Sequence, residues 1–153
     1  MKITDALRGE HGPLYALFLH CEESALKWEL ADLLLAGRCI EAALLSHARV
    51  EDELLFSAVE RVMPPGGPAS AMRAEHDEID RELMALRAAG TESQARQAMA
   101  TVIEKARDHF EKEEMVLFPL ADELIPAAEL ESLARAWADR RGVACSDRAP
   151  CHS

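Results

Sequence analysis

The sequence predicts an all-α protein: an up-and-down antiparallel four-helix bundle with a short C-terminal fifth helix. Apolar residues recur at steps of three and four along most of the chain, and no run of β-branched residues suggests a strand. Breaks rich in proline, glycine and capping residues separate the helical segments. The 153 residues, 49% of them hydrophobic, suit one domain with a buried core. We expect residues 1–142 to form the bundle with its docked fifth helix, and residues 143–153 to form a flexible tail.

Two breaks are visible in the middle of the chain. Residues 63–70 read "MPPGGPAS", whose prolines and glycines end one helix and allow a turn before Ser70 caps the next. Residues 88–93 read "AAGTES", whose glycine suits a C-terminal cap and whose Thr91 or Ser93 suits an N-terminal cap. The first of these breaks divides the chain into two helical hairpins.

Pro126 ends the fourth long helix near Ile125. The segment 127–142 that follows is a short amphipathic helix ending at Gly142. Its apolar face comprises Leu130, Leu133, Ala134 and Trp137. We expect this face to dock on the bundle.

Four histidines fall one to each predicted long helix, and two of them are followed one helical turn later by a glutamate. The histidines are His11, His47, His76 and His109, and the glutamates are Glu51 and Glu113. The surrounding strings also repeat, "HARVEDELLF" with "HFEKEEMVLF" and "RGEH" with "RAEH". The chain therefore consists of two related hairpins, each with one lone histidine and one His-x-x-x-Glu.

The turn between the first two helices has no glycine or proline at its expected position. Residues equally far from a turn lie at equal heights in antiparallel helices, and His11 and His47 are equidistant from Glu29. A turn at Gly37 would separate the two histidines in height by roughly 24 Å, at about 1.5 Å per residue. A shared site therefore predicts a turn near 28–31.

Helical periodicity places the four histidines on apolar stripes. The expected neighbours are Leu14, Tyr15 and Phe18 for His11; Ala43, Leu44 and Leu54 for His47; Ile79 and Leu83 for His76; and Val102, Ala106, Val116 and Leu117 for His109. A single histidine on such a stripe is usually an ordinary core residue with satisfied hydrogen bonds. Four at one level, accompanied by two buried glutamates, indicate a metal site, because a cation offsets the cost of burying carboxylates.

The same angular argument sorts the neighbouring polar residues. His20 lies about 180° from His11 around its helix and should face away from the site. Tyr15 and Asp80 each follow a histidine by four residues and are possible additional ligands. The alternative for Tyr15 is a core aromatic residue with a hydrogen-bonded hydroxyl, and the alternative for Asp80 is an acid at the surface or one that hydrogen-bonds a ligand. Glu114 is about 140° from His109 around the helix. We therefore expect it to be an alternative ligand, or an acid that hydrogen-bonds a ligand from outside, rather than one of the six donors. His152 lies in the tail and is excluded.

Imidazole and carboxylate donors together suit Fe, Mn and Zn. Six protein donors are too many for one tetrahedral zinc ion, but they suit two ions bridged by Glu51 and Glu113. Such a pair leaves positions for an oxo or hydroxo bridge and for an exogenous ligand. Reduced iron in this setting would bind O2, NO or peroxide.

Across residues 3–125 the sequence resembles the hemerythrin-like, or HHE cation-binding, family. The resemblance rests on "EHGPL" at His11, "SHARVEDELLF" around His47, "EHDEI" at His76 and "DHFEKEEMVLFP" around His109. It implies a four-helix bundle holding a non-haem di-iron centre, with the four histidines as terminal ligands and Glu51 and Glu113 as bridges. Members of the family are associated with oxygen carriage or storage, gas, redox or iron sensing, and defence against oxidative or nitrosative stress.

The chain departs from oxygen-carrying hemerythrins, which have a histidine at the place of Asp80 and space their fourth-helix acid by five residues rather than four. A carboxylate-rich donor set stabilises ferric iron, which favours turnover or sensing of an oxidant over release of intact O2. Three classes of function therefore stay open: a di-iron binder or sensor in stress defence, a di-iron enzyme acting on peroxide or NO, and a metal-free helical interaction module.

Acids outnumber bases by 28 to 17, and the resulting net charge of -11 argues against a nucleic-acid or anionic-membrane partner. The acidic N-terminal segment lacks the apolar run of a secretory signal, and no stretch is long enough to cross a bilayer. We therefore expect a cytoplasmic protein, in which Cys21 and Cys39 are reduced, and make the same assumption for Cys145 and Cys151 in the tail. The sequence leaves the oligomeric state open.

Overall fold

The computed structural model describes residues 1–143, and every regular element in this range is helical. The α-helices are α1 Ile3–Ser24, α2 Leu30–Val50, α3 Ser57–Val62, α4 Pro68–Arg87, α5 Glu92–Lys112, α6 Phe118–Leu124 and α7 Ala127–Arg141. A 3₁₀ turn, η1 Ala25–Lys27, follows α1, and two π-helical segments, η2 Glu51–Phe56 and η3 Glu113–Leu117, continue α2 and α5. The predicted flexible tail, with Cys145, Cys151 and His152, lies outside the described residues except for Val143.

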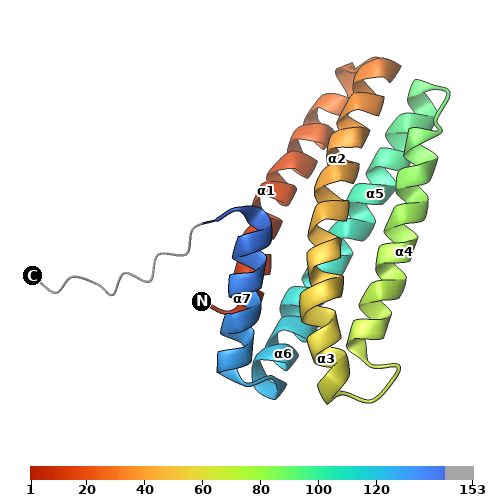
Figure 1. Cartoon of the computed structure of the whole chain (residues 1–153). Coiled ribbons are helices and arrows are strands. Elements are labelled where there is room, and N and C mark those ends of the chain that lie inside the picture. Colours follow the sequence, from red (N-terminus) through yellow and green to blue (C-terminus); the bar gives the residue numbers. More distant parts are fainter. Residues whose placement is uncertain (144–153) are drawn as a thin grey trace, which may run out of the picture.

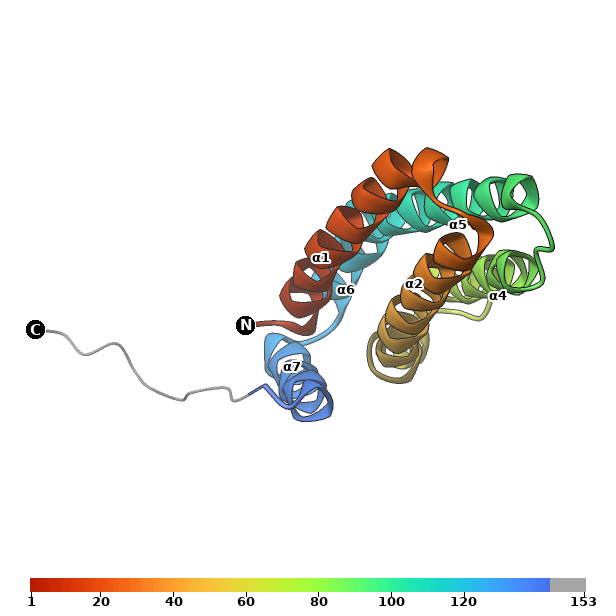
Figure 2. The same cartoon turned by 90° about the horizontal axis from the view of Figure 1, so that it is seen from above.

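Four long helical segments lie side by side (Figure 1). Because η2 joins α2 to α3 and η3 joins α5 to α6 without a turn, these segments are α1, α2–α3, α4 and α5–α6. Contacts join α4 to α5, α1 to α2, and α2 to both α4 and α5. Helix α7 packs on α1, at the side of the bundle, as the view from above shows (Figure 2).

The core consists of two apolar clusters, and each histidine lies in the sequence between residues of the two. One cluster includes Leu7, Val50, Met72 and Leu117, and the other includes Leu14, Leu44, Ile79 and Ala106. His11, for example, falls between Leu7 and Leu14 on α1. The fold therefore places a polar layer inside the bundle between two apolar layers.

The first turn lies where the alignment of the histidines predicted it. Trp28 and Glu29 connect η1 to α2, with extended backbone at both residues. At the third connection Thr91 is the N-cap of α5, and its hydroxyl accepts a hydrogen bond of 3.2 Å from the backbone N–H of Gln94. Both hairpins therefore bring their histidines to matching heights.

The expected Ser70 cap is wrong, because α4 begins earlier. Gly67 is the N-cap and Pro68 occupies the first turn. Proline suits this position because its ring fixes φ near the helical value and its missing N–H would have had no partner there. Ser70 is therefore inside the helix.

Helix α7 matches the amphipathic helix predicted at 127–142. Leu130 and Ala134 are buried, and Leu133 and Trp137 pack against the core. The helix is capped by Gly142 with φ of 65°, a left-handed conformation that glycine adopts without steric cost. Within residues 1–143, no helix combines the length and the apolar character needed to span a bilayer.

The prediction that Val116 shares the buried stripe of His109 is wrong, since Val116 is 54% exposed. In an uninterrupted α-helix Val116 would return to the histidine's face after seven residues. The π-helical segment η3 adds a residue to the turn, so Val116 turns outward, whereas Leu117 is buried as predicted and Phe118 is buried beside it. Both π segments begin at a glutamate of the predicted site, at equivalent places in the two hairpins.

Candidate metal centre

The structure brings the six predicted donors together from four helical segments. His11 lies on α1, His47 on α2, His76 on α4 and His109 on α5, and Glu51 and Glu113 are the first residues of η2 and η3. All six are buried, and both glutamates are fully inaccessible to solvent. They form two groups of four, in each of which one donor atom per residue lies within 4.8 Å of the others. We call the group containing His11 and His47 the first position and the group containing His76 and His109 the second position.

Glu51 and Glu113 belong to both positions. The Oε1 atom of Glu51 lies 3.0 Å from His47 Nε2, and its Oε2 atom lies 3.5 Å from His76 Nε2. Glu113 repeats this arrangement, with Oε2 3.4 Å from His11 Nε2 and Oε1 3.5 Å from His109 Nε2. Each carboxylate therefore turns one oxygen towards each position, which is the arrangement a bridging carboxylate requires.

The chemistry of these donors fits a pair of cations. All four carboxylate oxygens of Glu51 and Glu113 are buried without a hydrogen-bond partner. Burial, together with the charge of Glu51, raises the pKa of Glu113 well above its ordinary value. Burial alone would raise the pKa of Glu51 as well, but the charge of His47 holds it well below its ordinary value. The uncompensated cost therefore falls mainly on Glu113, and a bound cation would offset it.

Each imidazole also faces an acidic side chain on its outer edge. His11 Nδ1 lies 2.7 Å from Glu114, and His47 Nδ1 lies 2.7 Å from Glu10. On the other side of the centre, His109 Nδ1 lies 3.1 Å from Glu75, and His76 Nδ1 lies 3.3 Å from Asp52 without hydrogen-bonding geometry. A proton held at Nδ1 leaves Nε2 as the free acceptor that faces the site.

Sequence reasoning missed Glu10 and Glu75. Each directly precedes the lone histidine of its hairpin, in the repeated "RGEH" and "RAEH" strings, and reaches the histidine of the paired helix. Asp52 and Glu114 directly follow Glu51 and Glu113 and reach the lone histidine of the other hairpin. The internal repeat was therefore the available signal for all four outer acids.

The three additional candidates lie outside the two groups of four. Glu114 contacts the outer edge of His11 and is 32% exposed. The Tyr15 ring stands edge-on to the His11 ring, with centroids 6.4 Å apart, and burial raises the pKa of its hydroxyl. Asp80 lies beside the site in a cavity described below. His20 is exposed against Trp28, facing away from the centre as predicted.

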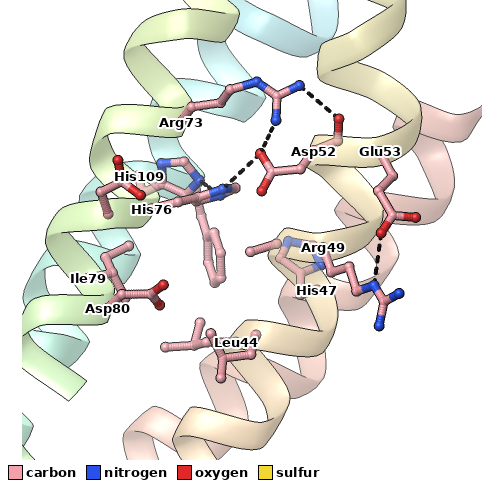
Figure 3. A pocket seen from close by; sticks show the side chains of 14 residues that line it. Leu44, His47, Arg49, Asp52, Glu53, Arg73, His76, Ile79, Asp80 and His109 are labelled. Atoms are coloured by element: carbon pink, nitrogen blue, oxygen red, sulfur yellow. Dashed lines mark hydrogen bonds and ion pairs between the residues drawn. The ribbon is translucent and has the colours of Figure 1, made fainter. Parts of the chain in front are cut away.

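A cavity of about 650 Å³ leads to the centre between α2 and α4 (Figure 3). Three of the donors line it, together with apolar and charged residues: His47, His76, His109, Leu44, Ile79, Phe110, Asp52, Arg73 and Asp80. Arg73 donates to the Asp52 carboxylate and to its backbone carbonyl, both at 2.8 Å, and this pair lies beside His76. The second position therefore has an approach for a small molecule.

Protons and cations compete for the same nitrogens. Burial alone would lower the pKa values of His47 and His76, but the negative charge of Glu51 and that of the outer acid beside each ring, Glu10 for His47 and Asp52 for His76, raise both to about 9. Burial lowers the pKa of His109 to about 4. In the metal-free protein at neutral pH, these shifts favour the protonated form of His47 and His76 and the neutral form of His109.

This difference predicts that cation binding releases protons. Because a cation needs neutral imidazole, ferrous ion should displace one proton from each of His47 and His76 at pH 7. Its apparent affinity should rise from pH 6 to pH 8 and level off only above about 9. Anaerobic titration calorimetry in two buffers of different ionisation enthalpy measures the released protons, and binding with no release would contradict the assignment.

The fold and the paired donor groups define a helical bundle with a candidate dinuclear cation site bridged by carboxylates. The sequence model of the hemerythrin HHE cation binding domain matches residues 2–121, and the chain belongs to this family. No curated protein and no solved structure matches the chain significantly. The matched residues include all six donors and end before α7.

Proposed function

We propose that the protein is a non-haem di-iron protein that binds O2, NO or peroxide inside an up-and-down antiparallel four-helix bundle and acts in oxidative or nitrosative stress defence or in gas or iron sensing. The observation that carries this proposal is the sharing of Glu51 and Glu113 between two four-donor groups, with all four carboxylate oxygens otherwise unpartnered. Membership in a cation-binding family supports it. Mn or Zn could occupy the same donors.

The donor set would hold the ions as follows. His11 and His47 would serve the first position, His76 and His109 the second, and the two glutamates both. A pair of ferrous ions bound there would supply the electrons needed to bind or reduce a small oxidant. The protein's contribution is to orient the imidazoles through their outer acids, exclude water with the two apolar clusters, and admit the ligand through the cavity.

Turnover of peroxide or NO at the same centre is a second candidate. The cavity favours it, because it reaches the second position and places the carboxylate of Asp80 close by. Burial raises the pKa of Asp80, so this group is a candidate proton carrier for an oxidant that must be protonated on reduction.

Anaerobic reconstitution with ferrous iron tests the proposal. We expect two irons per chain and a change in visible absorption when O2, NO or peroxide is added, neither of which a His47→Ala, His109→Ala double variant should show. Stoichiometric binding without consumption supports the binder, and disappearance of peroxide or NO beyond that stoichiometry supports the enzyme. A wild-type chain that takes up no iron would refute both.

A further inference from the structure

Helix α7 reaches the candidate metal centre through one half-buried carboxylate. Glu10 lies between α7 and His47, and its two oxygens accept four hydrogen bonds. Its Oε2 accepts from His47 Nδ1 at 2.7 Å and from Arg141 Nη2 at 3.0 Å. Its Oε1 accepts from Trp137 Nε1 and from Arg141 Nε, both at 2.6 Å. Two side chains of α7 therefore fix the acid that orients His47.

Arg141 also holds the helix that carries His47. Its Nη1 donates to Ser46 Oγ at 2.7 Å, and its Nη2 donates to the Ser46 carbonyl at 3.0 Å. Ser46 directly precedes His47 on α2. The side chains of Arg141 and Glu10 are only 22% and 18% exposed, so solvent weakens their interaction less than it would at the surface. One guanidinium thus connects α7 to both the outer acid and the backbone beside the donor.

At the second position α7 holds neither outer acid within residues 1–143; the arginine there, Arg73 of α4, binds Asp52 beside His76. Glu75 is the counterpart of Glu10 and lies 3.1 Å from His109 Nδ1, but its other side-chain partner in residues 1–143 is Lys112, at 2.7 Å. Lys112 is 51% exposed and lies on the same helix as His109. The internal repeat gives the two positions the same kinds of donor. Helix α7 makes them different, because it holds an outer acid of the first position only.

We propose that Trp137 and Arg141 are positioning residues of the metal centre, which act through Glu10 to fix the His47 imidazole and so strengthen cation binding at the first position. This inference rests on the proposed function, because it requires that the donors bind cations. Linkage then makes the effect reciprocal: α7 docking strengthens cation binding, and cation binding strengthens α7 docking.

Two variants of α7 test the inference by ferrous-ion titration under anaerobic conditions against a competing chromophoric chelator. Arg141→Met removes the guanidinium but keeps an apolar stem, and Trp137→Phe removes the N–H but keeps a packed ring. Each variant should lower the affinity for one of the two ions by about 10- to 100-fold, which is the usual effect of losing a residue that supports a metal ligand. The affinity for the other ion should stay at the wild-type value.

Two matched controls should change little at the first position. Arg140→Met alters the neighbouring residue of α7, whose side chain pairs with Glu53 at the surface. Lys112→Met removes the corresponding partner of Glu75. Wild-type affinity for both ions in Arg141→Met and Trp137→Phe would overturn the inference and leave the proposed function standing, whereas a wild-type chain that binds no ferrous ion would overturn both.

Hydrogen exchange tests the reciprocal effect, that of cation binding on the docking of α7. Amides of α7 in the wild-type protein should exchange more slowly when ferrous ion is bound, and this difference should shrink in Trp137→Phe. If Arg141→Met releases α7 altogether, Trp137→Phe still decides, because its ring maintains the apolar docking. Exchange of α7 that does not respond to ferrous ion in the wild-type protein would also overturn the inference.

Discussion

Replacing Glu51 with alanine should weaken the binding of both cations, whereas replacing His47 with alanine should weaken the binding of only one. Glu51 turns one oxygen towards each position, so its loss leaves each with three of its four donors. His47 belongs to the first position alone. For Glu51→Ala we expect a loss of affinity of about 100-fold or more at both positions. Loss of a residue that only hydrogen-bonds a ligand typically costs up to about 100-fold, and loss of a ligand itself should cost at least as much.

The matched control for this comparison is Glu53→Ala. Glu53 is two residues from Glu51 but exposed, and it pairs with Arg49 and Arg140 at the surface. Surface ion pairs contribute little, so this variant should bind both ions as the wild-type protein does. Anaerobic ferrous-ion titration distinguishes the variants, and retention of two tightly bound ions by Glu51→Ala would show that this carboxylate is not a bridge.

Bound metal should raise the melting temperature strongly. An ion at about 100 times its dissociation constant stabilises the folded state by about 2.7 kcal/mol, and two independent ions would contribute about 5 kcal/mol. At about 2–4 °C per kcal/mol for a chain of this size, the melting temperature should rise by roughly 10–20 °C. The physical reason is that the cations offset the burial of Glu51 and Glu113, which are fully inaccessible to solvent.

Thermal unfolding followed by circular dichroism, with ferrous ion or with a chelator, measures this shift. A Glu51→Ala, Glu113→Ala double variant is the control, and it should melt at the same temperature under both conditions. An unchanged melting temperature in the wild-type protein would favour a metal-free helical module instead.

The sequence was most informative where a geometric constraint was strict. The turn at Trp28 and Glu29 has no composition signal, yet aligning His11 with His47 located it. The same alignment, with helical periodicity, selected the six residues that the structure brings together. A site built across four helices requires its donors at one height, and this requirement can be read from spacing alone.

The errors arose where the helices depart from regular geometry or where contacts link distant residues. Val116 was misplaced because η3 is π-helical, and a constant angle per residue cannot anticipate the added residue. The clamp on Glu10 was missed because Trp137 and Arg141 lie more than a hundred positions away in the sequence. Periodicity predicted that α7 docks on the bundle, but not which polar group it would meet there.

The central claim is that Glu51 and Glu113 are shared by two cations. An anomalous difference map from crystals of the iron-loaded protein, collected at the iron absorption edge, tests it most directly. We expect two peaks about 3.5–4 Å apart, one beside His11 and His47 and the other beside His76 and His109, with both glutamates touching both peaks. A single peak, or two peaks that share neither glutamate, would contradict it.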